Sequence, residues 1–336
     1  MTLTEPNLST PIFSSIAHDF IDGKPIKRLM LCYRTIGCAH YRSEGGGCSM
    51  CAFPASSTGD IQVPVEMLKK QLTSELEKVG WDEEGLEELD IFCAGSFFND
   101  EEIPEKARIF TFETAKQLSN IKKLLVESRP EYITGDKIEK GAKILGPDID
   151  FEIAIGLESA SSRVRDDIIN KGFGLEEFEA SLKLIGEANA HLLVYIFLKP
   201  PGITEREAYY DTLESIKYVF KKANELGIKK VTAAVQPAFV QGEGYLHDLY
   251  VEGNYKPPWL WTIVKLLKEA DHLGEIQIGT SEDHPPPIAV RSNCPVCNEQ
   301  IEEAIETYNR TQDIRVFKKI ECECMEQWSE ETELTP

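Results

Sequence analysis

The chain is poor in positive charge: its 336 residues include 36 lysines and arginines against 57 aspartates and glutamates, a formal net charge of −21. This balance opposes non-specific attraction to nucleic-acid phosphates, although a local basic patch or a partner subunit can still supply a positive surface. No apolar run approaches the roughly 18–20 residues that cross a membrane, and residues 1–11 lack the features of a signal peptide. We therefore expect a soluble, cytoplasmic protein with no membrane partner.

The sequence also lacks the cysteine pattern of a disulfide framework. It has nine cysteines, an odd number, and most of them fall into two clusters with short spacings. In an intracellular chain, such clusters favour metal binding over disulfide pairing.

Short β-rich runs alternate with amphipathic helical patterns along most of the chain. In residues 65–79, for example, Val65, Leu68, Leu72 and Leu76 recur at the spacing of one buried helix face. Alternating strands and helices predict a parallel sheet with right-handed crossovers, and this number of units favours a barrel. The predicted strands are residues 28–33, 89–94, 122–127, 151–156, 191–197, 230–236 and 275–279. The predicted helices are residues 65–79, 105–118, 137–145, 162–170, 175–188, 205–226 and 258–273. We expect an α/β fold, a partial (β/α)6 TIM-type barrel.

The pattern changes after residue 279, where Asp283-His-Pro-Pro-Pro-Ile forms a stiff segment that cannot be helical. A boundary near Ser281 predicts three parts: an N-terminal extension (1–27), the barrel (28–280) and a C-terminal module with four cysteines and an acidic tail (281–336). Within that module, residues 298–319 are predicted to form a short helix and a hairpin.

Three cysteines, Cys38, Cys48 and Cys51, follow the first predicted strand. Catalytic groups of such barrels lie at the carboxyl ends of the strands, and the glycines of residues 45–47 allow a tightly folded loop there. Three thiolates suit an iron–sulfur cluster with one open iron, whereas a zinc site would have to recruit Cys32 from inside the strand. The spacing alone does not choose between the two.

Polar residues follow the next four predicted strands, in residues 93–100, 127–131, 156–163 and 199–204. Each segment alone is compatible with an ordinary turn between a strand and a helix. Together they predict a polar pocket above the cysteine loop.

Several segments carry a resemblance that extends over about residues 34–324. They are Arg34-Thr-Ile-Gly-Cys with Gly47-Cys-Ser-Met-Cys, Gly95-Ser-Phe-Phe, Glu127-Ser-Arg-Pro-Glu-Tyr-Ile, Ile155-Gly-Leu-Glu-Ser, Lys199-Pro-Pro-Gly, Gln236-Pro and Pro285-Pro-Pro-Ile with Asn293-Cys-Pro-Val-Cys. The chain resembles the radical S-adenosylmethionine (SAM) superfamily, most of all the branch of the archaeosine-synthase radical SAM subunit, which modifies a deazaguanine base in tRNA. It departs from the common pattern in the nine residues between its first two cluster cysteines, where three are usual, and in Met50, where an aromatic is usual.

The resemblance implies that Cys38, Cys48 and Cys51 hold a 4Fe-4S cluster. The cluster would cleave SAM reductively, with electrons from a ferredoxin- or flavodoxin-type protein, and a hydrogen atom would then be taken from substrate. By motif position, the SAM-binding residues would be Met50, Gly95, Ser96, Glu127, Glu158, Ser159, Arg163 and Gln236. Arg129 and Lys199 would reach the substrate, and no catalytic residue is assigned.

The same branch implies cleavage of a carbon–nitrogen bond in a lysine adduct of a deazaguanine base. In that branch a separate partner subunit attaches the lysine. The partner would also supply a positively charged surface for tRNA, which a chain with a net charge of −21 would otherwise repel. Two alternatives stay open: a radical SAM enzyme acting on a small molecule or a protein, and a zinc-binding scaffold protein.

The second cluster pairs Cys294 and Cys297 with Cys322 and Cys324. Four thiolates in two close pairs are typical of a structural zinc site. An auxiliary iron–sulfur cluster remains the alternative for these residues.

Overall fold

The computed structural model describes residues 7–21, 24–51, 56–59, 61–279 and 286–335. The predicted boundary at Ser281 and the first proline of the Pro285 segment lie outside these residues. The strands are β1 (Phe13–Ile21), β2 (Lys24–Cys32), β3 (Glu88–Phe92), β4 (Lys123–Glu127), β5 (Asp150–Glu158), β6 (His191–Leu198), β7 (Val231–Pro237) and β8 (Glu275–Ile278). The α-helices are α1 (Ala39–Arg42), α2 (Val65–Val79), α3 (Trp81–Glu84), α4 (Glu105–Gln117), α5 (Gly135–Leu145), α6 (Leu175–Glu187), α7 (Glu205–Glu225), α8 (Tyr245–Val251), α9 (Leu260–Ala270), α10 (Asn298–Thr311) and α11 (Cys324–Thr332). Shorter helical segments are η2 (Pro130–Tyr132), the π-helix η3 (Arg163–Ile168), η4 (Asp271–Leu273) and η5 (Ile314–Phe317).

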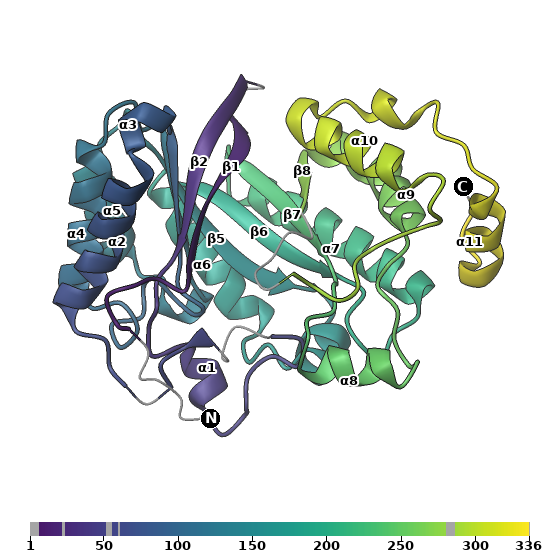
Figure 1. The fold of residues 1–336 in the computed structure, drawn as a ribbon, viewed down its shortest axis with the longest axis horizontal. Helices are drawn as coiled ribbons and strands as arrows, with labels where there is room; N and C mark the ends of the chain where they lie inside the picture. Colours follow the sequence, from purple (N-terminus) through teal and green to yellow (C-terminus); the bar gives the residue numbers. More distant parts are fainter. Residues whose placement is uncertain (1–6, 22–23, 52–55, 60, 280–285, 336) are drawn as a thin grey trace.

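All eight strands form one curled sheet in the order β1 to β8 (Figure 1). Strands β2 to β8 are parallel, and helices packed on the outer face connect them. The predicted partial barrel is therefore confirmed. Strand β1, which pairs antiparallel with β2, was missed because its residues alternate only weakly between apolar and polar.

The strands bury their two faces unequally. On β2, Leu29 and Leu31 pack beneath the helices with 0% exposure, while Arg28 and Met30 face the concave side and remain partly exposed. On β6, Tyr195 on the concave side is likewise partly exposed between buried neighbours. The concave face is therefore partly accessible at these side chains, and we call the space that it encloses the lumen.

Helix α10 caps the edge of the last strand. Asn309 exchanges two hydrogen bonds with the backbone of Ile278 (2.9 and 2.8 Å), and Gln312 exchanges two with the backbone of Ile276 (both 3.0 Å). These amides satisfy backbone groups that a neighbouring strand would bind in a closed barrel. The barrel therefore stays open between β8 and β1.

The predicted hairpin in residues 298–319 is wrong. Ile301, Ile305 and Tyr308 form a buried helical stripe that carries α10 to Thr311, and the short remainder forms η5 around the buried Phe317. Helix α11 follows and buries Trp328, whose indole donates to Thr262 Oγ1 (2.9 Å). Within the described residues, no helix is long and apolar enough to cross a membrane.

Candidate functional site

The cysteine loop, Cys38 to Cys51, follows the carboxyl end of β2 in the chain and includes α1. It is fastened to the segment that follows η3. Asn170 Nδ2 donates to the carbonyl oxygens of both Gly45 and Gly47 (2.8 Å each), and the carbonyl oxygen of Asn170 bonds His40 Nε2 (2.7 Å). Asn170 has a φ of 58°, in the left-handed region that asparagine tolerates better than most residues. This asparagine therefore fixes the glycine-rich part of the loop.

A buried carboxylate joins the loop to the turn after β3. Glu102 accepts hydrogen bonds from the backbone of Ala39 (2.9 Å) and Ser96 (2.5 Å). A Cβ at Gly95 would lie 2.0 Å from Glu102 Oε2 and 3.1 Å from Cys38 Cα, so only glycine fits there. Burial raises the pKa of Glu102 although these two amides favour its ionised form.

Two buried cations lie beside Cys48. Lys171 Nζ contacts Glu158 Oε1 (2.8 Å), while Arg129 contacts Glu131 and donates to the carbonyl oxygen of Lys171 (2.9 Å). Burial alone would lower the pKa of Lys171, but Glu158 and Cys48 raise it overall. Burial raises the pKa of the Cys48 thiol, and both cations oppose that rise. Cys48 therefore lies beside two buried cations, each of which is also paired with a carboxylate.

Glu127 ends β4 on the concave side of the sheet, beside the Tyr195 hydroxyl. Burial raises the pKa of Glu127 to about 7, and the neighbouring Asp90 and Glu158 add to the rise. This carboxyl group can therefore gain or lose a proton near neutral pH.

The structure thus gathers Gly95, Ser96, Arg129 and Glu158 around the cysteine loop. Met50 also belongs here: it packs against a small buried cluster that contains Ala238, just beyond Gln236 on β7.

Three other predicted residues have partners elsewhere. Ser159 donates to Asp211 (2.7 Å), and Arg163 is 57% exposed and pairs with Glu207 (3.3 Å). Lys199 pairs with Glu205 (2.5 Å). Their roles toward SAM or substrate remain predictions.

Sequence reasoning missed Glu102, Lys171 and Asn170. Each is a single polar residue in a polar segment, and its role depends on contacts across 63, 13 and 125 positions of the sequence, respectively. Cys32 and Cys93, by contrast, are buried at 1% and 0% exposure, as expected of core residues.

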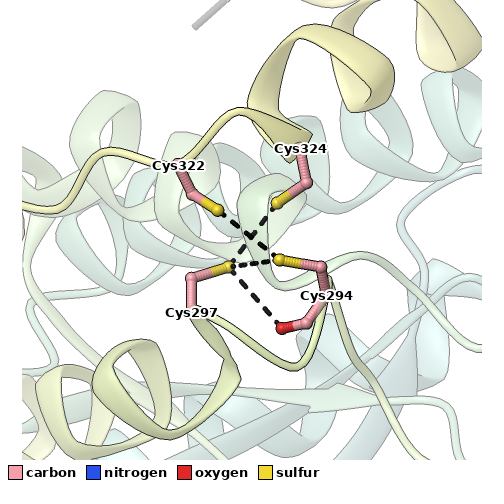
Figure 2. Close-up of side chains that lie close together, drawn as sticks. All are labelled: Cys294, Cys297, Cys322 and Cys324. Atoms are coloured by element: carbon pink, nitrogen blue, oxygen red, sulfur yellow. Dashed lines mark hydrogen bonds between the residues drawn. The ribbon is translucent and has the colours of Figure 1, made fainter.

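The four C-terminal cysteines converge (Figure 2). Their sulfur atoms all lie within 4.8 Å of one another, with 3.7 Å between Cys294 and Cys297. Cys294 and Cys322 are 3.5 Å apart, as are Cys297 and Cys324. Four thiolates around one zinc ion, with zinc–sulfur bonds of about 2.3 Å, stand roughly 3.8 Å apart. The geometry fits a single tetrahedral ion, and the Trp261 indole N–H on Cys324 Sγ (3.2 Å) would support a thiolate there.

Among the described residues, these cysteines are the only group of three or more cysteine, histidine or acidic side chains that converges so tightly. Cys38, Cys48 and Cys51 are described and stand further apart.

Comparison with known proteins places the chain in a family. No protein-family model matches it. An uncharacterized protein of Methanocaldococcus jannaschii is 33% identical over 94% of this chain and 83% of its own length. The archaeosine synthase subunit beta of Methanosarcina acetivorans is 28% identical over 96% of this chain and 90% of its own. Among solved structures, the chain matches the archaeal Methanocaldococcus infernus Elp3 with a TM-score of 0.48 and 15% identity, over 73% of this chain and 59% of that one. The chain belongs to the archaeosine-synthase branch of the radical SAM superfamily, a superfamily of enzymes.

Proposed function

We propose that Cys38, Cys48 and Cys51 hold a 4Fe-4S cluster and that the chain uses it to cleave SAM reductively in archaeosine synthesis. The observation that carries this proposal is the three-cysteine loop, fastened to the carboxyl ends of the strands beside the buried cations Lys171 and Arg129. When bound, the cluster and SAM supply the electron and the radical that takes a hydrogen atom from substrate.

The surrounding side chains would orient SAM and exclude water. Lys171 and Arg129 would stabilise the thiolate of Cys48 and attract the carboxylate of SAM, because buried cations bind anions strongly. Gly95 allows the turn after β3 to approach Cys38, while Glu127 and Glu158 offer acceptors to the ammonium group or the ribose. The remaining predicted SAM contacts are Met50, Ser96, Ser159, Arg163 and Gln236, of which Met50 would pack on the adenine.

For the substrate, we propose a lysine adduct of a deazaguanine base in tRNA, in which a carbon–nitrogen bond is broken. The support is the similarity to proteins named archaeosine synthase subunit beta, a name that also implies a second subunit. That partner would attach the lysine and contribute the basic surface that a chain of charge −21 lacks. Arg129 and Lys199 remain proposed substrate contacts, and a ferredoxin- or flavodoxin-type protein would supply electrons.

We propose a structural zinc ion for the C-terminal cysteines. Four thiolates complete its coordination and leave no position open for substrate. Trp328, which joins α11 to α9, places this module against the outer helices, so the ion would stabilise the C-terminal region.

The test is an anaerobic assay of the chain reconstituted with iron and sulfide. Dithionite-reduced protein is expected to form deoxyadenosine from SAM, and the variant with Cys38, Cys48 and Cys51 changed to Ala is expected to form none. The variant with Cys294 and Cys297 changed to Ala is the matched control and should keep its iron. Colourless protein that binds only zinc and forms no deoxyadenosine would refute the proposal.

A further inference from the structure

Arg28 projects from β2 into the lumen below the candidate site, with 27% of its side chain exposed. Its ion pairs within the described residues use one terminal nitrogen: Nη1 lies 3.1 Å from Asp90 Oδ2 and 3.8 Å from Asp19 Oδ2. Nε is buried and has no hydrogen-bond partner among the described residues. Asp90 and Asp19 therefore hold the guanidinium group from one side and leave its Nε edge unused.

A neighbouring lysine shows what a purely structural cation looks like in the same network. Lys123 Nζ lies 2.9 Å from Asp19, 2.7 Å from Glu88 and 3.3 Å from Glu152, so three carboxylates surround its single charged nitrogen. Arg28 differs because its Nε has no such partner among the described residues.

Part of the lumen wall between Arg28 and the cysteine loop is apolar. Leu125, Ala154, Leu193 and Ala234 pack together there with Phe92 and Tyr195. The Tyr195 hydroxyl lies close enough to both Arg28 and Glu127 to influence their ionisation. An aliphatic chain entering from the cysteine loop would pass this wall and end at Arg28.

We propose that the lumen binds the aliphatic arm of the substrate and that Arg28 recognises a carboxylate at the far end of that arm. A guanidinium edge matches a carboxylate with two parallel hydrogen bonds, and burial strengthens both. This inference rests on the proposed function, and it takes the lysine to be joined to the base through its side-chain nitrogen, which would place the carboxylate beyond a four-carbon chain.

Three small probes test the inference on the reconstituted protein with SAM bound. Nε-acetyl-L-lysine carries the carboxylate at the far end of the chain, N-acetylcadaverine is the same arm without a carboxylate, and Nα-acetyl-L-lysine has the carboxylate beside the acylated nitrogen. Titration calorimetry is expected to show Nε-acetyl-L-lysine binding roughly tenfold or more tightly than either of the others, the worth of one charge-assisted contact. Arg28→Met should remove this preference, and Arg28→Lys, which keeps the charge but loses the two-pronged edge, should weaken it. Lys123→Arg should keep it.

Equal binding of the three probes to the native protein would overturn the inference, even if every Arg28 variant failed to fold. An equal loss of all three probes in Arg28→Met, with SAM affinity unchanged, would also overturn it. SAM cleavage is measured on the same samples. Protein that cleaves SAM without distinguishing the probes refutes this inference alone, whereas protein that cannot cleave SAM refutes the proposed function.

Discussion

Replacement of Asn170 by aspartate should loosen the cysteine loop without changing the size of the side chain. Asn170 Nδ2 donates to two carbonyl oxygens of the loop, Gly45 and Gly47, at 2.8 Å each. A carboxylate cannot donate, and it would place an oxygen against both carbonyls. Two lost hydrogen bonds at about 1 kcal/mol each amount to about 2 kcal/mol, or roughly a 30-fold shift toward local opening.

Hydrogen exchange followed by mass spectrometry measures that shift directly, since amides of residues 39–51 exchange through local opening. The matched control is Asn189→Asp. Asn189 also has a left-handed backbone (φ 52°), but it is exposed, and its side chain makes no hydrogen bond with the other described residues. Exchange in residues 39–51 should accelerate in Asn170→Asp only, and the reconstituted variant should lose its iron faster to a chelator. Equal exchange rates in the two variants would refute the role given to Asn170.

Three further changes test other parts of the structure. Gly95→Ala should reduce the iron content and destabilise the fold by about 1–3 kcal/mol, because the added Cβ would lie 2.0 Å from Glu102 Oε2. Gly242→Ala is the control, since a Cβ added there would have no atom within 4 Å, and it should change neither quantity. Iron analysis and urea unfolding measure the two effects. Burial raises the pKa of Glu127 from 4.5 to about 7, so the folded chain keeps a proton that the unfolded chain releases, and its stability should fall as pH rises through that window. Glu127→Gln should flatten this part of the pH profile in urea unfolding, and an unchanged profile would contradict the assigned environment. Cys297→Ser should release about one zinc ion per chain, as measured by mass spectrometry of the native protein. It should also raise the rate of hydrogen exchange in residues 294–332 but not in β3 to β6. Retained zinc would contradict the four-thiolate site.

The alternation of apolar runs and amphipathic helices was sufficient to predict β2 to β8 and the barrel. Local periodicity reports which side of an element is buried, and in a parallel barrel nearly every element buries one side completely. It could not predict β1, because an edge strand such as Ser14 to Phe20 packs on one side only and carries polar residues on both faces. It also missed the amides of Asn309 and Gln312 that cap β8, since these depend on a helix placed more than 30 residues later.

Some residues of the candidate site could likewise be predicted from the sequence, and others could not. Cysteines in short spacings were recognisable, because metal ligands cluster in sequence. The residues that hold the cysteine loop in place were not, because Glu102 and Asn170 reach it from other strand ends. The position of Arg28 inside a predicted strand did not indicate that it faces the lumen with an Nε that has no partner among the described residues.

The most direct test of the central claim is deoxyadenosine formation by the anaerobically reconstituted, reduced chain. The account predicts formation of deoxyadenosine from SAM that disappears when Cys38, Cys48 and Cys51 are changed to Ala and persists when Cys294 and Cys297 are changed. Deoxyadenosine formation that survives loss of the three N-terminal cysteines, or is absent from iron-loaded native protein, would contradict it.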